Sequence, residues 1–190
     1  MPKLYTEGKT FNGVDFTAQA LPIGNYEGCT FVNCNFSNTN LSDVYFIECK
    51  LEQCNVSVAT IANTAFRDIT FKNCKLLGLH FENANAILFE VQFEACQLNL
   101  SSFYQRSLKN TQFKNCSLQE VDFVEADLTN AVFHNCDLSY AIYENTILEK
   151  ADFRTAYHYS INPELNRIKK AKFSMAGIIG LLDKYDIEVE

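Results

Sequence analysis

A large apolar residue recurs at every fifth position through most of this 190-residue chain, and this period restricts the folds available to it. An α-helix has 3.6 residues per turn and a β-strand has a side-chain period of two, so neither produces a period of five. Before a slip of two residues, the positions are Phe11, Phe16, Leu21, Tyr26, Phe31, Phe36, Leu41, Phe46, Leu51, Val56, Ile61, Phe66, Phe71, Leu76 and Phe81. After the slip they are Leu88, Phe93, Leu98, Phe103, Leu108, Phe113, Leu118, Phe123, Leu128, Phe133, Leu138, Tyr143, Leu148 and Phe153. No polar residue interrupts either series, so each repeat must turn its large apolar residue inward.

A second restricted position lies two residues before each large apolar residue. It holds mostly Cys, Ala, Thr, Ser or Val, so we expect this small side chain to point inward as well. The other three positions of each repeat are rich in polar residues. Of the 25 charged residues between Phe11 and Phe153, 24 lie at these three positions, and Arg106 is the exception. Each repeat therefore shows two side chains to a core and three to solvent.

Residue types also recur every 20 positions, which indicates that four repeats make one coil of a solenoid. One column contains Cys34, Cys54 and Cys74 and continues after the slip with Cys96, Cys116 and Cys136. Coils stacked at strand spacing lie roughly 4.8 Å apart, so about seven coils predict a rod roughly 34 Å long.

Segments such as Ala126-Asp127-Leu128-Thr129-Asn130 and Cys136-Asp137-Leu138-Ser139-Tyr140 resemble the repeat of the pentapeptide-repeat family. The resemblance extends from Phe11 to Phe153. It implies an all-β solenoid, a right-handed four-sided (quadrilateral) β-helix. We expect this β-helix over residues 1–173, with a slip near 84–88, and a C-terminal helix and tail over 174–190.

The cysteines and histidines give little indication of a catalytic or metal site. All eight cysteines occupy the small inward position, where a thiol acts as a compact apolar group. Cys-x2-Cys spacing, which metal sites favour, is absent. His80 and His134 fall at outward positions and His158 at a large apolar position, and no nucleophile is spaced to act with them. There is no glycine-rich phosphate loop. The sequence thus predicts a protein without catalytic residues, cofactor, metal or small-molecule substrate, and not an enzyme.

The chain shows neither a charged and apolar leader nor an apolar run near twenty residues. Reduced thiols fit a cytosolic compartment. We therefore expect a cytoplasmic protein that does not enter a membrane.

Arg106 allows two interpretations. Its stem could fill space beside the irregular coil while its guanidinium pairs with a carboxylate such as Glu90. Alternatively, Arg106 and the slip between Ala84 and Leu88 could form a recognition feature.

The net charge of −7 is unevenly distributed along the chain. Residues 116–153 hold Lys150 as their single base and eight acids. These acids are Glu120, Asp122, Glu125, Asp127, Asp137, Glu144, Glu149 and Asp152. Fixed carboxylates on a narrow rod attract basic surfaces and repel DNA phosphates. They predict a protein partner that normally binds DNA, with no direct contact of this chain to nucleic acid.

Both ends of a solenoid need a cap, because an open coil exposes strand edges and apolar side chains. We expect residues 1–10 to cover the first coil. At the other end, Ser174 is a candidate N-cap for an amphipathic α-helix over Met175 to Tyr185, which would cap the last coil. Apolar residues left over predict an isologous homodimer through this end. The predicted dimer residues are Ile178, Ile179, Leu181, Leu182, Tyr185, Ile187 and Val189.

The last 17 residues are similar to the cap of the Qnr-type and mycobacterial fluoroquinolone-resistance pentapeptide proteins. This resemblance implies a dimeric, acidic, DNA-like rod that interacts with a type II topoisomerase, DNA gyrase or topoisomerase IV. The leading hypothesis is therefore a non-catalytic DNA mimic, with quinolone protection as an associated role. The chain lacks the long loops that several Qnr-type proteins use for protection, and its middle coils are mildly basic. The alternative is an interaction scaffold with an unrelated protein partner.

Overall fold

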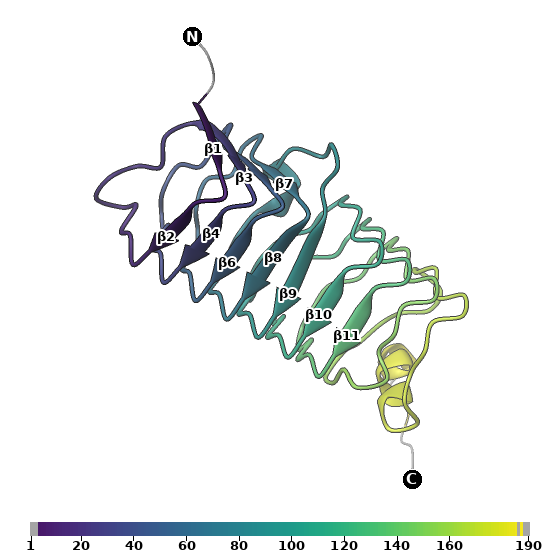
Figure 1. Cartoon of the computed structure of the whole chain (residues 1–190). Coiled ribbons are helices and arrows are strands. Elements are labelled where there is room, and N and C mark those ends of the chain that lie inside the picture. Colours follow the sequence, from purple (N-terminus) through teal and green to yellow (C-terminus); the bar gives the residue numbers. More distant parts are fainter. Residues whose placement is uncertain (1–3, 186, 188–190) are drawn as a thin grey trace.

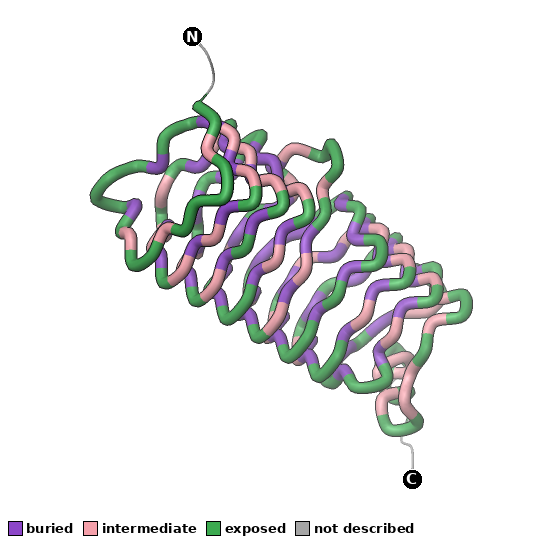
Figure 2. The backbone as a smooth tube through the Cα atoms, viewed as in Figure 1, coloured by how far each residue is buried: buried purple, intermediate pink, exposed green. Residues whose placement is uncertain are grey.

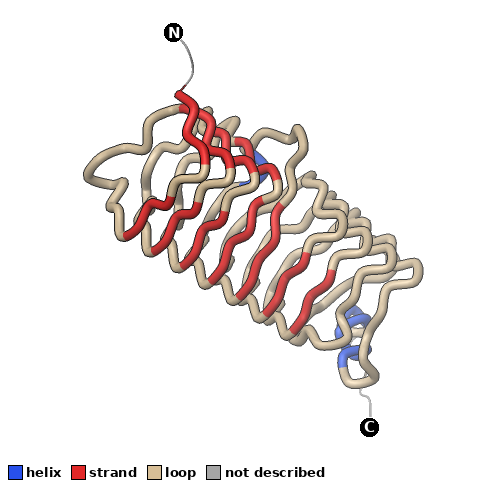
Figure 3. The backbone as a smooth tube through the Cα atoms, in the orientation of Figure 1, coloured by secondary structure: helices blue, strands red, loops and turns tan. Residues whose placement is uncertain are grey.

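The computed structural model describes residues 4–185 and 187, which form a four-sided parallel β-solenoid (Figure 1). This architecture confirms the predicted fold. Two faces of the rod contain regular strands, which Figure 3 shows in red. The first face is the sheet β1 (Leu4–Glu7), β3 (Gly24–Glu27), β5 (Tyr45–Ile47) and β7 (Ala65–Arg67). The second face is the sheet β2 (Thr10–Asn12), β4 (Thr30–Val32), β6 (Lys50–Glu52), β8 (Ile69–Lys72), β9 (Val91–Glu94), β10 (Gln112–Lys114) and β11 (Val132–His134).

The third and fourth faces are held by single parallel bridges between coils. On the third face, Asn35 bridges to Asn55, and on the fourth, Ser102 bridges to Asp122. The third face includes residues 34–38, 54–58, 74–78, 96–100, 116–120 and 136–140, and bridges to Asp15 at one end and to Tyr157 at the other. The fourth face includes residues 39–43, 59–63, 79–83, 101–105, 121–125 and 141–145, with the 3₁₀-helix η1 (Phe81–Asn83), and continues into 161–165. Successive faces of one coil therefore follow each other at five-residue intervals.

The core consists of the two inward positions that the period predicts. Buried and exposed residues alternate along each coil (Figure 2). Phe113 stacks between Phe93 and Phe133, with ring centroids 5.2 and 4.9 Å away. All eight thiols are buried, and Cys136 Sγ donates to the Phe113 carbonyl at 3.3 Å. Burial raises the pKa of Cys49 to about 11, so this thiol stays protonated at neutral pH.

Each coil turns its corners through residues with left-handed backbone conformation. At the edge between the second and third faces, Asn33, Asn73, Asn115 and Asn135 have φ of 52°, 53°, 54° and 51°. Asparagine tolerates this conformation better than most residues, because its short polar side chain bonds locally. The frequent Asn of the repeat is therefore a consequence of its corners.

The two-residue slip is a bulge on the first face that lies between Asn85 and Phe89. Asn85 still follows the upstream register, since its N–H donates to the Thr64 carbonyl at 2.9 Å. The chain then leaves the face, and Leu88, predicted to point inward, is 72% exposed. Phe89 fills the core instead, with its ring 6.4 Å from that of Phe66. The two extra residues of the bulge bring the chain back to the first face at Phe89. The prediction that Leu88 points inward was therefore wrong.

The first ten residues do not cover the first coil as predicted. Residues 4–7 and 10–12 are strands β1 and β2 of that coil, and residues 1–3 lie outside the described part. Thr10 pairs in parallel with Thr30, as later coils pair with each other. The reason is that Phe11 already occupies the apolar position of a repeat, so the chain enters the solenoid at once.

The predicted C-terminal α-helix is absent and is replaced by two 3₁₀-helices, η2 (Gly177–Leu181) and η3 (Asp183–Tyr185). The Ser174 Oγ accepts from the Gly177 N–H at 3.0 Å, but the N-cap residue of η2 is Ala176, which makes no side-chain capping bond. The Gly180 carbonyl accepts from the Ile161 N–H at 2.8 Å instead of from a helical N–H. A side chain at position 180 would overlap the Tyr159 carbonyl, so the segment touches the last coil backbone to backbone. This close contact and the low helix propensity of glycine favour short 3₁₀ turns over an α-helix.

Candidate interaction surface

The eight predicted acids of residues 116–153 do not form one patch, because the coil distributes them over all four faces. The second face has Asp152, and the first has Asp127 and Glu149. Asp137 and Glu120 are on the third face, with Glu120 at its edge with the fourth. The fourth face has Asp122, Glu125 and Glu144. Proximity in sequence therefore does not mean proximity on the surface of this rod.

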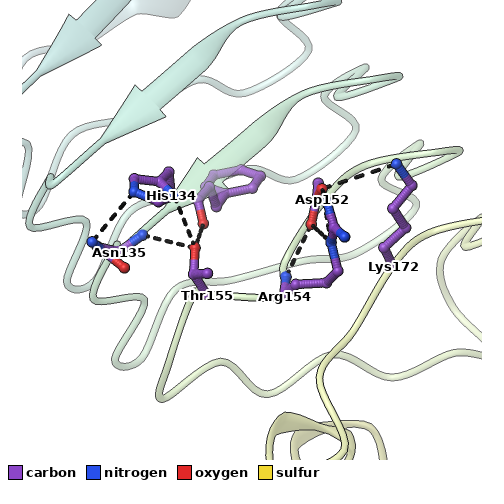
Figure 4. Close-up of polar contacts among 7 residues, drawn as sticks. His134, Asn135, Asp152, Arg154, Thr155 and Lys172 are labelled. Atoms are coloured by element: carbon purple, nitrogen blue, oxygen red, sulfur yellow. Dashed lines mark hydrogen bonds and ion pairs between the residues drawn. The ribbon is translucent and has the colours of Figure 1, made fainter.

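Three of these acids are paired with a nearby lysine or arginine, and a fourth lies beside a histidine. Asp127 lies 3.1 Å from Lys109 Nζ, and Glu149 lies 2.7 Å from an Arg167 nitrogen. Asp152 accepts from Arg154 at 2.7 Å and lies 4.0 Å from Lys172 Nζ (Figure 4). The fourth, Asp137, is 3.2 Å from Nδ1 of the exposed His158, and the two form an ion pair when this histidine is protonated.

These contacts also favour the ionised carboxylates. The hydrogen bonds donated by Arg154 hold the pKa of Asp152 below its usual value. Burial alone would raise the pKa of Asp127, but hydrogen bonds from Thr129 and the contact with Lys109 bring its pKa below the usual value. Their negative charge is partly neutralised locally and is less available to a partner.

The other four acids, Glu120, Asp122, Glu125 and Glu144, make no ion pair with any residue in 4–185. Asp122 Oδ1 accepts from the Val124 N–H at 2.8 Å, and Glu125 accepts from Gln105 at 2.7 Å. All four lie on the fourth face or at its edge with the third. The six fourth-face segments named above contain no lysine or arginine, and on the next coil Glu164 pairs with Lys184 at 2.6 Å. The fourth face is therefore the face with unbalanced negative charge.

Arg106 fixes the bulge in place. Its side chain is buried, and its Nη2 donates to the carbonyl of Glu82 and, at 2.5 Å, to that of Ala84. Its guanidinium carbon lies 5.6 Å from the centre of the Phe89 ring. Burial lowers the pKa of Arg106, and nearby Glu82 opposes this shift. Among the described contacts, the guanidinium meets backbone carbonyls and an aromatic ring, not the Glu90 carboxylate suggested by the sequence.

The C-terminal segment covers part of the last coil and leaves several predicted dimer residues exposed. Leu181 packs on the core, and Leu182 is also partly buried. Four others keep 44% to 56% of their surface exposed, namely Ile178, Ile179, Tyr185 and Ile187. Val189 lies outside the described residues.

No group of three or more His, Cys, Asp or Glu residues in the described part of the chain could hold a metal ion. No helix in it is long and apolar enough to cross a membrane.

The geometry defines a four-sided β-solenoid built from five-residue repeats with a filled core. The family model described as pentapeptide repeat region matches residues 25–87 and 86–157. The chain belongs to the pentapeptide repeat family.

Two solved structures share its fold. One is a trypsin-treated form of QnrB1, a plasmid-mediated fluoroquinolone resistance protein, with a TM-score of 0.62, 19% identity, and coverage of 98% of this chain and 92% of that one. The other is HetL, a pentapeptide repeat protein involved in heterocyst differentiation regulation from the cyanobacterium Nostoc, with a TM-score of 0.56, 13% identity, and coverage of 91% and 87%. No curated protein sequence matches the chain. At these identities the similarity concerns the fold.

Proposed function

We propose that this protein is a non-catalytic DNA mimic that binds a type II topoisomerase, DNA gyrase or topoisomerase IV, in the cytoplasm. The observation that carries the proposal is the fourth face, where four carboxylates without an ion pair stand on a rigid rod, on or beside segments that contain no lysine or arginine of their own. Such a surface attracts a basic DNA-binding groove electrostatically. The structural similarity to QnrB1, a fluoroquinolone resistance protein, supports this choice of partner. Protection of the enzyme from quinolones follows if the protein competes with DNA for that groove.

The unpaired acids are the first test of this proposal. We expect the triple variant Asp122→Asn, Glu125→Gln, Glu144→Gln to bind DNA gyrase about tenfold or more weakly at low salt, because three uncompensated charges are lost. Asparagine at 122 can still accept from the Val124 N–H, so the coil is preserved. Binding is measured by titration at two salt concentrations, and the effect on gyrase by a supercoiling assay.

A matched control removes the same number of charges from the paired acids. The variant Asp127→Asn, Glu149→Gln, Asp152→Asn should change gyrase affinity less than about threefold, since these carboxylates are already partly neutralised by Lys109, Arg167 and Arg154. Equal losses in both triple variants would show that only net charge matters. If the wild-type protein neither binds nor affects gyrase and topoisomerase IV at low salt, the proposed function is wrong.

The second part of the proposal is a homodimer through the C-terminal segment 174–190. Its support is the exposure of Ile178, Ile179, Tyr185 and Ile187 at the end of the rod. We expect a solution mass about twice the 21.6 kDa of one chain. The variant Ile178→Asp, Ile179→Asp should return the mass to that of a monomer, because it buries charge in an apolar contact. Static light scattering measures both, and a monomeric wild-type protein would rule out this interface.

The alternative function is an interaction scaffold for a protein that does not bind DNA. The similarity in fold to HetL, which is involved in heterocyst differentiation regulation, favours keeping this alternative. Affinity capture followed by recovery of a partner without DNA-binding activity would support it over the topoisomerase.

A further inference from the structure

Large apolar residues occupy left-handed corners along one edge of the rod. At the edge between the third and fourth faces, Val58, Leu100 and Tyr140 have φ of 49°, 62° and 59°. Elsewhere among the described non-glycine residues with positive φ, the corners carry Asn, Asp, Glu, Gln, Ala, Lys or His, apart from Leu88 in the bulge. The row is thus specific to this edge.

These three residues contribute little to the fold. Their exposed fractions are 52% for Val58, 59% for Leu100 and 84% for Tyr140. A left-handed backbone is unfavourable for such side chains, and for a β-branched valine in particular. They combine backbone strain with exposed apolar surface, whereas Asn at the same corner, as at Asn38 with φ of 56°, avoids both. Strain of this kind is typical of residues retained for binding.

The surroundings of the row are apolar and negatively charged. On the adjoining fourth face, Tyr104 and Ile142 are 36% and 49% exposed. A surface hollow of about 330 Å³ lies beside Val58, lined also by residues 59–62, Gly78, His80 and Asn83. Gly78 helps to keep this hollow open, because it has no side chain; a Cβ there would lie only 3.2 Å from Val58 Cγ1. Of the unpaired acids, Glu120 stands on the same edge between Leu100 and Tyr140, and Asp122 lies next to it on the fourth face, whereas Glu125 and Glu144 lie toward the far side of that face.

The spacing of the row matches one face of an α-helix. Val58, Leu100 and Tyr140 lie two coils apart, which corresponds to about 10 Å between neighbours. Residues i and i+7 of an α-helix are about 10.5 Å apart along its axis. An amphipathic helix lying along the rod can therefore place an apolar side chain beside each of the three corners, while basic residues on its flanks meet the carboxylates.

We propose that this edge binds a positively charged amphipathic helix of a partner protein. The inference rests on the proposed role as a binding protein but not on the partner being a topoisomerase. It adds an apolar, oriented contact to the electrostatic attraction that DNA mimicry requires.

The probe is a synthetic helical peptide of about 16 residues with leucine at every seventh position and arginine on both flanks. A control peptide of the same composition has its leucines spread around the helix. We expect the wild-type protein to bind the patterned peptide at least about tenfold more tightly, measured by fluorescence titration. The variant Val58→Asn, Leu100→Asn, Tyr140→Asn should lose this preference while its Tm rises by about 2–4 °C or more, since asparagine relieves the strained corners.

A matched control variant replaces exposed apolar residues elsewhere, Ile87→Asn, Leu88→Asn and Leu165→Asn, and should bind the patterned peptide like the wild type. Equal binding of both peptides, no binding of the patterned peptide, or an unchanged affinity of the edge variant would overturn the inference.

Gyrase binding by the same edge variant separates this inference from the proposed function. If the protein binds the patterned peptide but neither DNA gyrase nor topoisomerase IV, the helix-binding edge is supported and the proposed topoisomerase partner is wrong. If the edge variant binds DNA gyrase as tightly as the wild type does, the proposed topoisomerase partner is supported and the edge is not its contact surface.

Discussion

Replacing Arg106 by alanine should destabilise the protein by about 3 kcal/mol, because it leaves carbonyl groups of the bulge without their donor. For a chain of this length, that loss lowers Tm by roughly 6–12 °C. In the native protein the guanidinium donates to the carbonyls of Glu82 and Ala84 and covers the Phe89 ring. Thermal unfolding followed by circular dichroism measures the change, and limited proteolysis should show earlier cleavage within residues 85–89.

The cost of losing Arg106 should disappear when the bulge is removed. Deleting Asn85 and Ala86 leaves Ala84-Ile87-Leu88-Phe89-Glu90, a regular repeat with Leu88 at the inward position. In that background alanine at 106 is the small inward residue that most coils have. We therefore expect the deletion combined with Arg106→Ala to be at least about 2 kcal/mol more stable than the sum of the separate effects predicts. Additive effects would mean that Arg106 is not coupled to the bulge.

The regular part of the fold could be predicted from the sequence because every coil repeats the same physical requirement. Phe113 and Cys116 are buried as their positions in the five-residue period demand. The prediction misplaced Leu88 because two adjacent residues near the slip, Leu88 and Phe89, are both large and apolar, and either could occupy the inward position. Counting back from Leu108 selects Leu88, whereas the backbone keeps the upstream register as far as Asn85. Apolar character alone does not locate an insertion when Leu88 and Phe89 are adjacent.

The acidic surface could be predicted in part. The excess of acids in residues 116–153 is evident from the sequence, but neighbours such as Glu125 and Asp127 lie on different faces. Separating the acids by their position in the 20-residue coil would have shown that the fourth face lacks lysine and arginine. Ion pairs such as Glu149 with Arg167 join successive coils, so a linear count of charges does not reveal them. The apolar corners Val58, Leu100 and Tyr140 had a signal too, since large apolar residues are rare at the corner position, two residues after the large apolar residue of each repeat.

The C-terminal segment shows the limit of helical periodicity as evidence. The pattern of Ile178, Leu181 and Leu182 is amphipathic, yet the segment forms 3₁₀-helices. The competing factor is tertiary, because the Gly180 carbonyl is taken by the Ile161 N–H of the last coil. The sequence gives no sign of this hydrogen bond, because neither residue 161 nor residue 180 belongs to the regular repeat.

A cavity in the phenylalanine column at the middle of the rod should strongly destabilise the protein. Phe113 is fully buried, stacked on both sides and packed edge-on to Phe103 and Phe123 with centroids 6.2 Å away. We expect Phe113→Ala to lower the free energy of unfolding by about 4 kcal/mol and Tm by roughly 8–16 °C. Because each coil is buried only by its neighbours, one cavity weakens the coupling between both halves.

Phe173 provides the matched control at the end of the same column. Its ring is partly buried and stacks on Phe153 alone, at 5.4 Å, with Tyr159 tilted against it at 5.7 Å. Phe173→Ala should therefore cost only about 1–2 kcal/mol, since less surface is buried and only one stacked neighbour is lost. Urea unfolding of both variants gives the comparison. Equal costs at Phe113 and Phe173 would contradict a stability that depends on stacking from both sides, and would place the main stabilisation within each coil instead.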